Sequence, residues 1–138
     1  MGAAAREIGA MRKEVLERRE LKKATKMRVY NAIVIPTMLY GSETWTMMKR
    51  YESRLGTTEM AYLRRVEGVS RIDRVRNADV REAVRQEEVM EKVKRKQRTW
   101  KENLEKMEDD RLVKKVYTEE IVGKRPRGKP RKKWIDNF

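Results

Sequence analysis

The segment Met27–Trp45 is the strongest candidate for a hydrophobic core in a chain that is otherwise dense in charge. Charged residues make up 42% of the 138 residues and hydrophobic residues 38%, so the core is modest for this length. Pro36 lies inside the segment and has no N–H to donate, so it breaks or kinks a helix there. Alternatively, Pro36 is the first residue of a short helix, "PTMLYG", which Gly41 closes.

The rest of the chain also carries helical signals, whereas strand signals are nearly absent, with no Asn-Gly hairpin and no sustained apolar alternation. We expect Thr25 to cap a helix that starts at Lys26. The other expected helices are one over about 48–67 that Gly68 ends, one from Asn77 to about Arg85, a long one from about Glu87, and a short one capped near Asp110. The sequence therefore predicts an all-α fold, an irregular helical array.

Composition divides the chain into three parts. Residues 1–24 are expected to form a charged N-terminal helix, residues 25–122 a helical domain, and residues 123–138 an extended basic C-terminal tail. The chain has no cysteine and no apolar run near the ~20 residues that a transmembrane helix needs. Its first residues have no apolar signal core and carry early acids, so we do not expect a secretory or transit peptide. We therefore expect an intracellular protein, nuclear or cytoplasmic, that does not engage a membrane.

The common catalytic groups are missing from this sequence. Without histidine and cysteine, the usual triads and thiol sites cannot be built, and no Walker-type phosphate loop is present. The string "MEDD", from Met107 to Asp110, looks like a polymerase motif whose aspartates hold magnesium, but that motif needs a tight β-hairpin. We interpret these acids as a cap for the next helix. No enzyme activity, metal or cofactor is expected for this chain alone.

The net charge of +14 indicates a polyanionic partner, with nucleic acid as the first candidate and an anionic membrane face as the second. Of these two we expect nucleic acid. The connector "VSRIDRVRN" sets Arg71, Arg74 and Arg76 at close spacing, and guanidinium groups fork onto phosphate oxygens. The alternative reading of the connector is a solvated loop that Asp73 partly neutralises.

The strongest local signal is "GKRPRGKPRKKW", which runs from Gly123 to Trp134 with seven Lys or Arg and no acid. Its Pro and Gly residues prevent a helix, so the cations lie along an extended strand that can follow a phosphate backbone. The segment is also near an AT-hook core, and it fits a nuclear-localisation signal or a solvated tail. The tail residues expected to bind nucleic acid are Lys124, Arg125, Arg127, Lys129, Arg131, Lys132 and Lys133.

Three aromatic residues, Trp45, Tyr62 and Trp100, could in principle stack on bases. Their helical spacing favours core positions instead, so the sequence predicts that they pack inside the fold.

Four blocks of the sequence, taken in order, resemble the C-terminal part of a non-LTR (LINE-type) retrotransposon reverse transcriptase, with the RTE-like endonuclease-reverse transcriptases nearest. The blocks are "YNAIVIPTMLYGSETWTM", "RRVEGVSRIDRVRNADVRE", "RTWKENLEKMEDDRL" and "RGKPRKKWID". The resemblance covers roughly Lys26 to Asp136, and "LYGSETW" is a fairly specific string.

In that family an endonuclease nicks target DNA and the polymerase copies the element RNA from the nick. The resemblance implies that residues 25–122 are thumb-like and that the basic segment follows the thumb, without the fingers and palm that carry the catalytic aspartates. The family usually has Gly and His shortly after the tryptophan of the long helix, where this chain has Glu102 and Asn103. Any role of that histidine is therefore lost.

We expect a non-catalytic fragment that binds nucleic acid through the phosphates of the nucleic-acid backbone. The ligand is either a template–primer, of RNA or DNA, or the target DNA. A second hypothesis is a repurposed protein-interaction module, in which surface that once met the palm drives self-association. The candidate residues for that apolar patch are Ile33, Val34, Met38 and Trp100. A third is an AT-hook-like nuclear DNA-binding protein.

Overall fold

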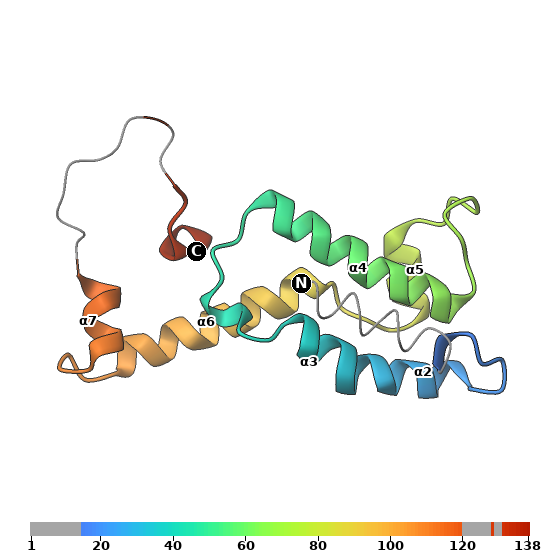
Figure 1. Ribbon diagram of the computed structural model, residues 1–138, viewed down its shortest axis with the longest axis horizontal. Helices are drawn as coiled ribbons and strands as arrows, with labels where there is room; N and C mark the ends of the chain where they lie inside the picture. The colour runs from blue at the N-terminus through green and yellow to red at the C-terminus, as the bar shows by residue number, and fades with distance from the viewer. Residues whose placement is uncertain (1–14, 120–127, 129–130) are drawn as a thin grey trace.

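The computed structural model describes residues 15–119, 128 and 131–138, and all the regular secondary structure among them is helical (Figure 1). The elements in order are α2 (Lys23–Val29), the π-helical turn η2 (Tyr30–Val34), α3 (Ile35–Met38), the 3-10 turn η3 (Ser42–Thr44), α4 (Lys49–Glu67), α5 (Asn77–Ala83), α6 (Val89–Lys106), α7 (Leu112–Thr118) and the 3-10 turn η4 (Trp134–Asn137). The predicted all-α class is confirmed. Most of the helix predicted over 1–24 lies outside the described residues, and residues 17–22 form no helix.

The first apolar segment is one continuous helical run in which Pro36 makes no break. The Ile35 N–H reaches back five residues to the Tyr30 carbonyl, so a wide π-helical turn precedes the proline. Pro36 then lies in the first turn of α3, where its missing N–H costs little. Gly41, with a φ of 67°, adopts the left-handed conformation that follows the run. The run also begins earlier than predicted, after Lys22, so Thr25 lies inside α2 and is not its cap.

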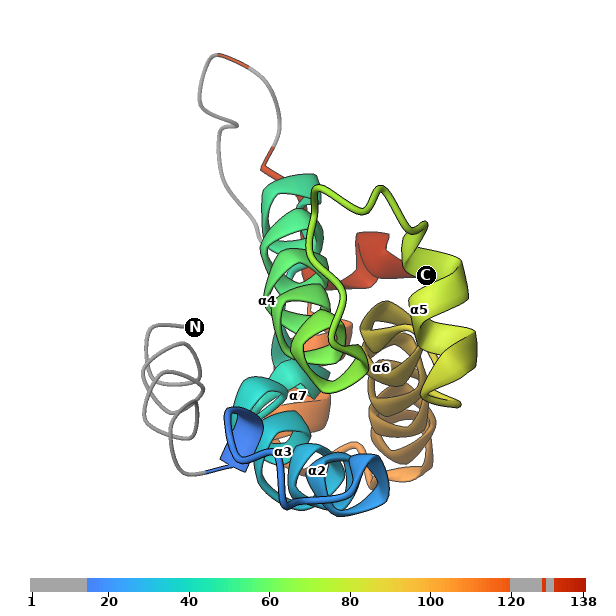
Figure 2. The same cartoon turned by 90° about the vertical axis from the view of Figure 1, so that its right-hand side faces the viewer.

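The prediction for α4 is confirmed at both ends. Met48 is the residue before its first turn, and Gly68 ends the helix in the left-handed conformation with a φ of 78°. Leu55, Tyr62 and Val66 are buried on one face of the helix. That face lies against the α2–α3 run and α6, which run roughly alongside α4 (Figures 1 and 2).

Two hydrophobic clusters fill the space between these helices. One cluster gathers residues of α2, η2, the second half of α4 and α5 around Tyr30 and Tyr62, whose ring centroids lie 4.9 Å apart. The other gathers α3, Met47, Leu55 and the start of α6. Val34 and Met38 are buried in these clusters, so their prediction as an exposed apolar patch is wrong. The patch was expected from surface that once met a palm, but here α4 covers Val34, and α4 and α6 together cover Met38.

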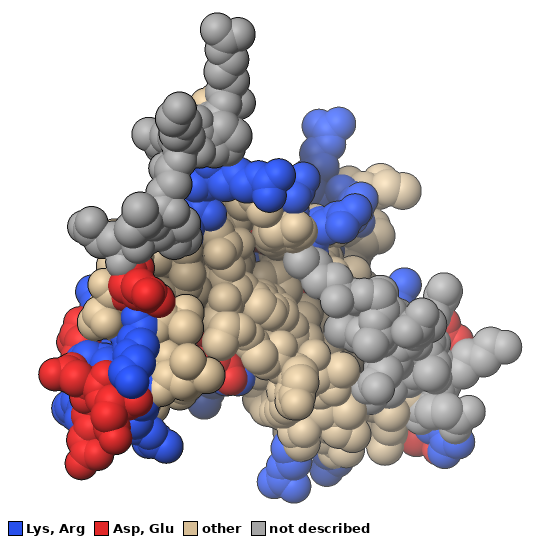
Figure 3. All heavy atoms as spheres, turned by 60° about the vertical axis from the view of Figure 1, so that its left-hand side comes forward, with Lys and Arg blue, Asp and Glu red and all other residues tan. Residues whose placement is uncertain are grey.

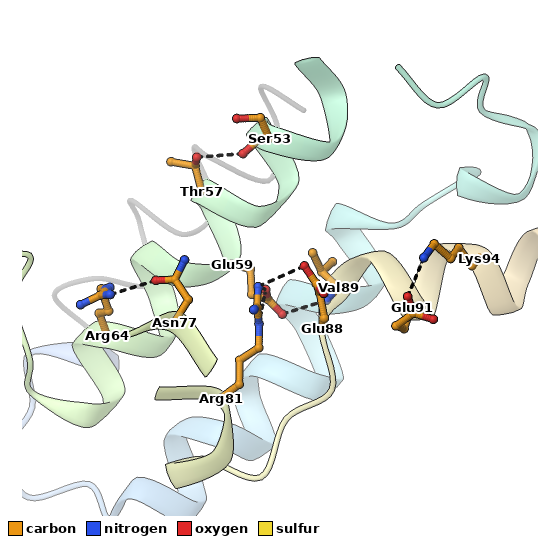
Figure 4. Close-up of polar contacts among 10 residues, drawn as sticks. All are labelled: Ser53, Thr57, Glu59, Arg64, Asn77, Arg81, Glu88, Val89, Glu91 and Lys94. Carbon is orange, nitrogen blue, oxygen red and sulfur yellow. Dashed lines mark hydrogen bonds and ion pairs between the residues drawn. The ribbon is translucent and has the colours of Figure 1, made fainter. Parts of the chain in front are cut away.

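A buried ion pair joins three helices at the centre of the fold (Figure 4). Oε2 of Glu59, in α4, accepts hydrogen bonds from Nε and Nη2 of Arg81, in α5, at 3.0 and 2.6 Å. Oε1 accepts the N–H of Val89, the first residue of α6, at 3.0 Å. Burial raises the pKa of the Glu59 carboxyl, and the hydrogen bond and charge of Arg81 offset part of that rise. One side chain therefore positions the other two helices against α4.

A second buried polar residue, Gln97, explains the interruption of the apolar face of α6. Its Nε2 donates to the carbonyls of Ser42 and Trp45, at 3.0 and 2.9 Å. These carbonyls belong to η3 and the strap that follows it, where a buried carbonyl needs a side-chain donor. Gln97 therefore fastens the strap 45–48 to α6.

Two helix caps differ from their predictions. Arg76, and not Asn77, precedes α5, and the Asn77 side chain accepts a hydrogen bond from Arg64 instead. Arg111 precedes α7 without a side-chain capping bond, so the acids of "MEDD" do not cap this helix. They lie in the turn between α6 and α7, where the Arg111 N–H donates to the Glu108 carbonyl. Among the described residues, no helix is both long and apolar enough to cross a membrane.

We predict that the ion pair between Glu59 and Arg81 is strongly coupled. Arg81→Met leaves the Glu59 carboxylate as an uncompensated buried charge, so it should lower the free energy of unfolding by about 3–5 kcal/mol. Glu59→Leu should cost less, because Arg81 keeps Glu88 as a partner at 3.6 Å. The double variant leaves no buried charge and should cost clearly less than the sum. Urea denaturation followed by circular dichroism gives the four free energies of the cycle. Purely additive effects would contradict the prediction; Asp79→Ala, which breaks an exposed ion pair with Arg76, is the control and should have little effect.

We also predict that stability falls above about pH 10, where tyrosine ionises in the unfolded chain. Burial raises the pKa of Tyr62 to about 12, and burial with the nearby Glu59 charge raises that of Tyr30. Because the pKa of each tyrosine is higher in the folded than in the unfolded chain, stability is complete below about pH 10 and is lost as the pH rises toward 12. In this window, each tyrosine should lower the free energy of unfolding by about 1.4 kcal/mol for each pH unit of increase.

Urea titrations at increasing alkaline pH measure this effect as a difference between variants. Tyr62→Phe should show a shallower loss of stability than the wild type, because one group no longer titrates. Tyr40→Phe should follow the wild type, since Tyr40 is 84% exposed. Equal slopes for Tyr62→Phe and the wild type would count against the assignment.

Candidate nucleic-acid interface

Arg64, near the end of α4, holds the connector between α4 and α5 in shape. Its guanidinium donates to the carbonyls of Ser70 and Val75, at 3.2 and 2.6 Å, and to Oδ1 of Asn77 at 2.9 Å. Within the connector, Oδ2 of Asp73 accepts the Ser70 N–H and hydroxyl at 2.6 and 2.9 Å. These Ser70 hydrogen bonds lower the pKa of the Asp73 carboxyl. The connector is therefore a shaped loop, with its acid engaged by its own backbone.

The three arginines predicted from this connector are all exposed. Arg74 has a φ of 54°, in the left-handed region that residues with a side chain seldom adopt. The side chains of Arg71 and Arg74 make no hydrogen bond or ion pair within the described part of the chain. Arg76 pairs with Asp79, with Nε 3.0 Å from Oδ2. The connector therefore presents two uncommitted guanidinium groups and one that is partly neutralised.

The C-terminal cations Arg131, Lys132 and Lys133 lie at the other end of α4. Lys132 Nζ donates to the Met47 carbonyl at 2.8 Å, just before α4 begins. The residues after it form η4, which differs from the extended tail predicted there. Lys124, Arg125, Arg127 and Lys129 lie outside the described residues, and so does most of the AT-hook-like string.

The turn η4 makes three more hydrogen bonds, one to η3 and two to the strap before α4. The indole N–H of Trp134 donates to the Glu43 carbonyl at 2.8 Å. Asn137 donates to the Trp45 carbonyl at 2.8 Å and accepts the Met47 N–H at 3.0 Å. The carboxyl end of the predicted basic tail is thus attached to the helical domain.

A row of arginines along α4 connects these two basic regions. Positions 50, 54, 58, 61 and 65 share one face of a helix with 3.6 residues per turn, and three of them are the exposed Arg50, Arg54 and Arg65. We call this the arginine face of α4; it carries no acid. At a rise of 1.5 Å per residue, the 19 residues of α4 separate the two basic regions by about 28 Å. These arginines were not among the residues predicted to bind nucleic acid, although a helical projection of the predicted helix places them on one face.

The groove beside this face is less suited to a polyanion. It has a volume of about 1050 Å³ and is lined by Arg64, Arg65 and Arg71, but also by Glu52 and Glu88. Figure 3 shows one view in which Lys and Arg form a band across the upper part, whereas at the lower left acids and basic side chains lie together. The arginine face of α4 is therefore the better surface for phosphate contact.

The three aromatic residues considered for base stacking differ in how deeply their side chains are buried. Tyr62 is fully buried, as predicted, and its hydroxyl donates to the Lys26 carbonyl at 2.9 Å. Trp45 and Trp100 are only half-buried. Trp45 therefore has surface that can meet a ligand, while Tyr62 serves the core.

No protein-family model, curated protein or solved structure significantly matches this chain. The resemblance to retroelement reverse transcriptases accordingly remains an expectation that rests on the four sequence blocks.

We predict that Arg64 protects the connector from proteolysis. Arg64→Ala removes the three hydrogen bonds that hold residues 70, 75 and 77, so limited trypsin digestion should cleave faster after Arg71 and Arg74. Arg65→Ala is the matched control, because it removes the same charge from an exposed neighbour that holds nothing in the connector. Mass spectrometry of the fragments gives the cleavage rates. Equal rates for the two variants would show that Arg64 does not shape the connector.

Proposed function

We propose that this chain binds the phosphate backbone of nucleic acid through the arginine face of α4 and the basic regions at its two ends. One observation carries the proposal: the basic side chains of this face point to solvent together, whereas two of the three acids of α4 are engaged elsewhere. Glu59 is buried against Arg81, and Glu67 pairs with Lys23. The fold thereby gives a helix of mixed charge one face of a single sign.

The geometry favours contact with the backbone over reading of bases. Exposed guanidinium groups on a rigid helix can fork onto phosphate oxygens along one side of a strand or duplex. Such contacts position nucleic acid and carry no sequence information. In the reading that the retroelement resemblance supports, the ligand is template–primer or target DNA, and the chain acts without chemistry of its own.

A second candidate function, self-association, is favoured by α7. Leu112 and Val116 are 76% and 68% exposed on this helix, and Val113 is also exposed. Such a group of large apolar side chains indicates a protein contact. Light scattering at high salt, without nucleic acid, separates the two functions, because oligomers that persist there favour the protein contact.

We predict a steep salt dependence of DNA binding. If about five cations meet phosphates, the plot of log affinity against log salt should have a slope of roughly −4 to −5 on B-DNA. Fluorescence anisotropy with a labelled duplex measures it. The triple variant Arg50→Ala, Arg54→Ala, Arg65→Ala should make the slope less steep by about 0.9 for each phosphate that the variant no longer neutralises.

A matched control removes three cations from the other end of the molecule: Lys106→Ala, Arg111→Ala, Lys115→Ala. These residues are exposed at the end of α6 and in or just before α7, among acids, so the slope should stay near that of the wild type. A flat salt dependence of the wild type would refute nucleic-acid binding. Equal slopes for the two triple variants would refute the arginine face as the contact surface.

A further inference from the structure

A small pocket opens where the strap before α4 meets the first turn of that helix. It is lined by Trp45, Thr46, Met47 and Tyr51 and has a volume of about 340 Å³. That volume is at the lower end of the range of about 300–1,000 Å³ for small-molecule pockets, so it suits a single planar group with part of its substituent. The two rings, both half-buried, pack against the second hydrophobic cluster on their inner side.

The wall of this pocket is held in place by hydrogen bonds from other elements. The Trp45 carbonyl accepts from Gln97 and Asn137, at 2.9 and 2.8 Å, and the Met47 N–H donates to Asn137 at 3.0 Å. The strap thus joins α6 on one side and η4 on the other. A pocket whose wall is fixed in this way needs little rearrangement to bind a ligand.

Thr46, between these two anchored residues, is different. Its hydroxyl and its main-chain N–H have no hydrogen-bond partner within the described part of the chain. The pocket therefore offers aromatic rings together with a polar residue whose donors and acceptors are available. This is the combination that a nucleobase requires, because its faces stack and its edge hydrogen-bonds.

Two cations contact residues that line this pocket. The Arg50 guanidinium lies 4.8 Å from the centre of the Tyr51 ring and donates to its hydroxyl at 3.0 Å. Lys132 is bonded to the Met47 carbonyl and retains two further ammonium donors. Arg131 and Lys133 are its exposed neighbours in sequence. Positive charge at the rim of a base-sized aromatic pocket suits a ligand that carries phosphate beside a planar ring.

We propose that this pocket binds one unpaired base of a single-stranded nucleic acid, with Trp45 and Tyr51 stacking on the base and Arg50 and Lys132 meeting the adjacent phosphates. The site extends the proposed backbone contact along α4 and rests on it. Because a paired base cannot enter a pocket of this size, the site selects single strands, or the unpaired end of a duplex, over continuous duplex.

The test measures anisotropy of a labelled short oligothymidylate and of a labelled duplex with the full chain. Tyr51→Leu should weaken binding of the single strand by about 5- to 150-fold, the range that base–aromatic stacking energies correspond to. Tyr51→Phe keeps the ring and should bind as the wild type does. Tyr40→Leu removes an exposed tyrosine away from the pocket and should change nothing. Duplex binding should be the same in all four proteins.

A second measurement needs no substitution. Ultraviolet cross-linking of the wild-type chain to an iodouracil-substituted oligonucleotide, followed by peptide mass spectrometry, should attach the base to Trp45 or Tyr51. Cross-links confined to other residues would overturn the pocket assignment, as would unchanged single-strand affinity in a folded Tyr51→Leu variant. Binding of neither probe by the wild type would refute the proposed function itself, so the two failures are distinguishable.

Discussion

The buried carboxylate of Glu59 is the constraint on which the arrangement of the helices depends. A charge without solvent must be matched by donors, and here they come from Arg81 in α5 and from the first N–H of α6. Both contacts join residues far apart in the sequence, and together they fix the positions of α5 and of the start of α6 relative to the middle of α4. The connector 69–76 is then bounded by α4 and an anchored α5, which leaves Arg64 to shape only the segment between them.

The same strategy recurs throughout this small core. Side chains donate to carbonyls in distant elements: Tyr62 to Lys26, Gln97 to Trp45 in the strap, and Trp134 to Glu43. Apolar burial alone is limited in a chain with 42% charged residues, so such directional contacts decide which helix faces meet. They also explain how a short turn at the carboxyl end can be attached to residues that precede it by about ninety positions.

Helix positions that depend on neighbouring residues could be predicted from the sequence, whereas polar residues that are buried in the core could not. The apolar period and Gly68 predicted α4, because a left-handed glycine and a buried stripe are properties of neighbouring residues. Gln97 looked like an interruption of an apolar face, and Glu59 gave no signal at all. Their partners are distant in the sequence: Val89 lies 30 residues from Glu59, and Trp45 of the strap lies 52 residues from Gln97. The exposed patch at Val34 and Met38 was wrong because it assumed surface left open by a missing palm, whereas helices of this chain cover both residues.

The candidate site depends on which charged residues of α4 face the core and which face solvent. By composition alone, α4 mixes acids with bases and indicates no binding face. The helical period separates them, because Arg50, Arg54 and Arg65 share one face, whereas Glu59 faces the core and Glu67 pairs with Lys23. The two ends of that row also differ: a shaped basic connector follows its carboxyl end, and an aromatic pocket with cations at its rim lies at its amino end. Under the proposed function, a strand lying along α4 would therefore meet phosphate-binding groups along its length and a base-binding pocket at one end only, which gives the bound strand a fixed register on the helix.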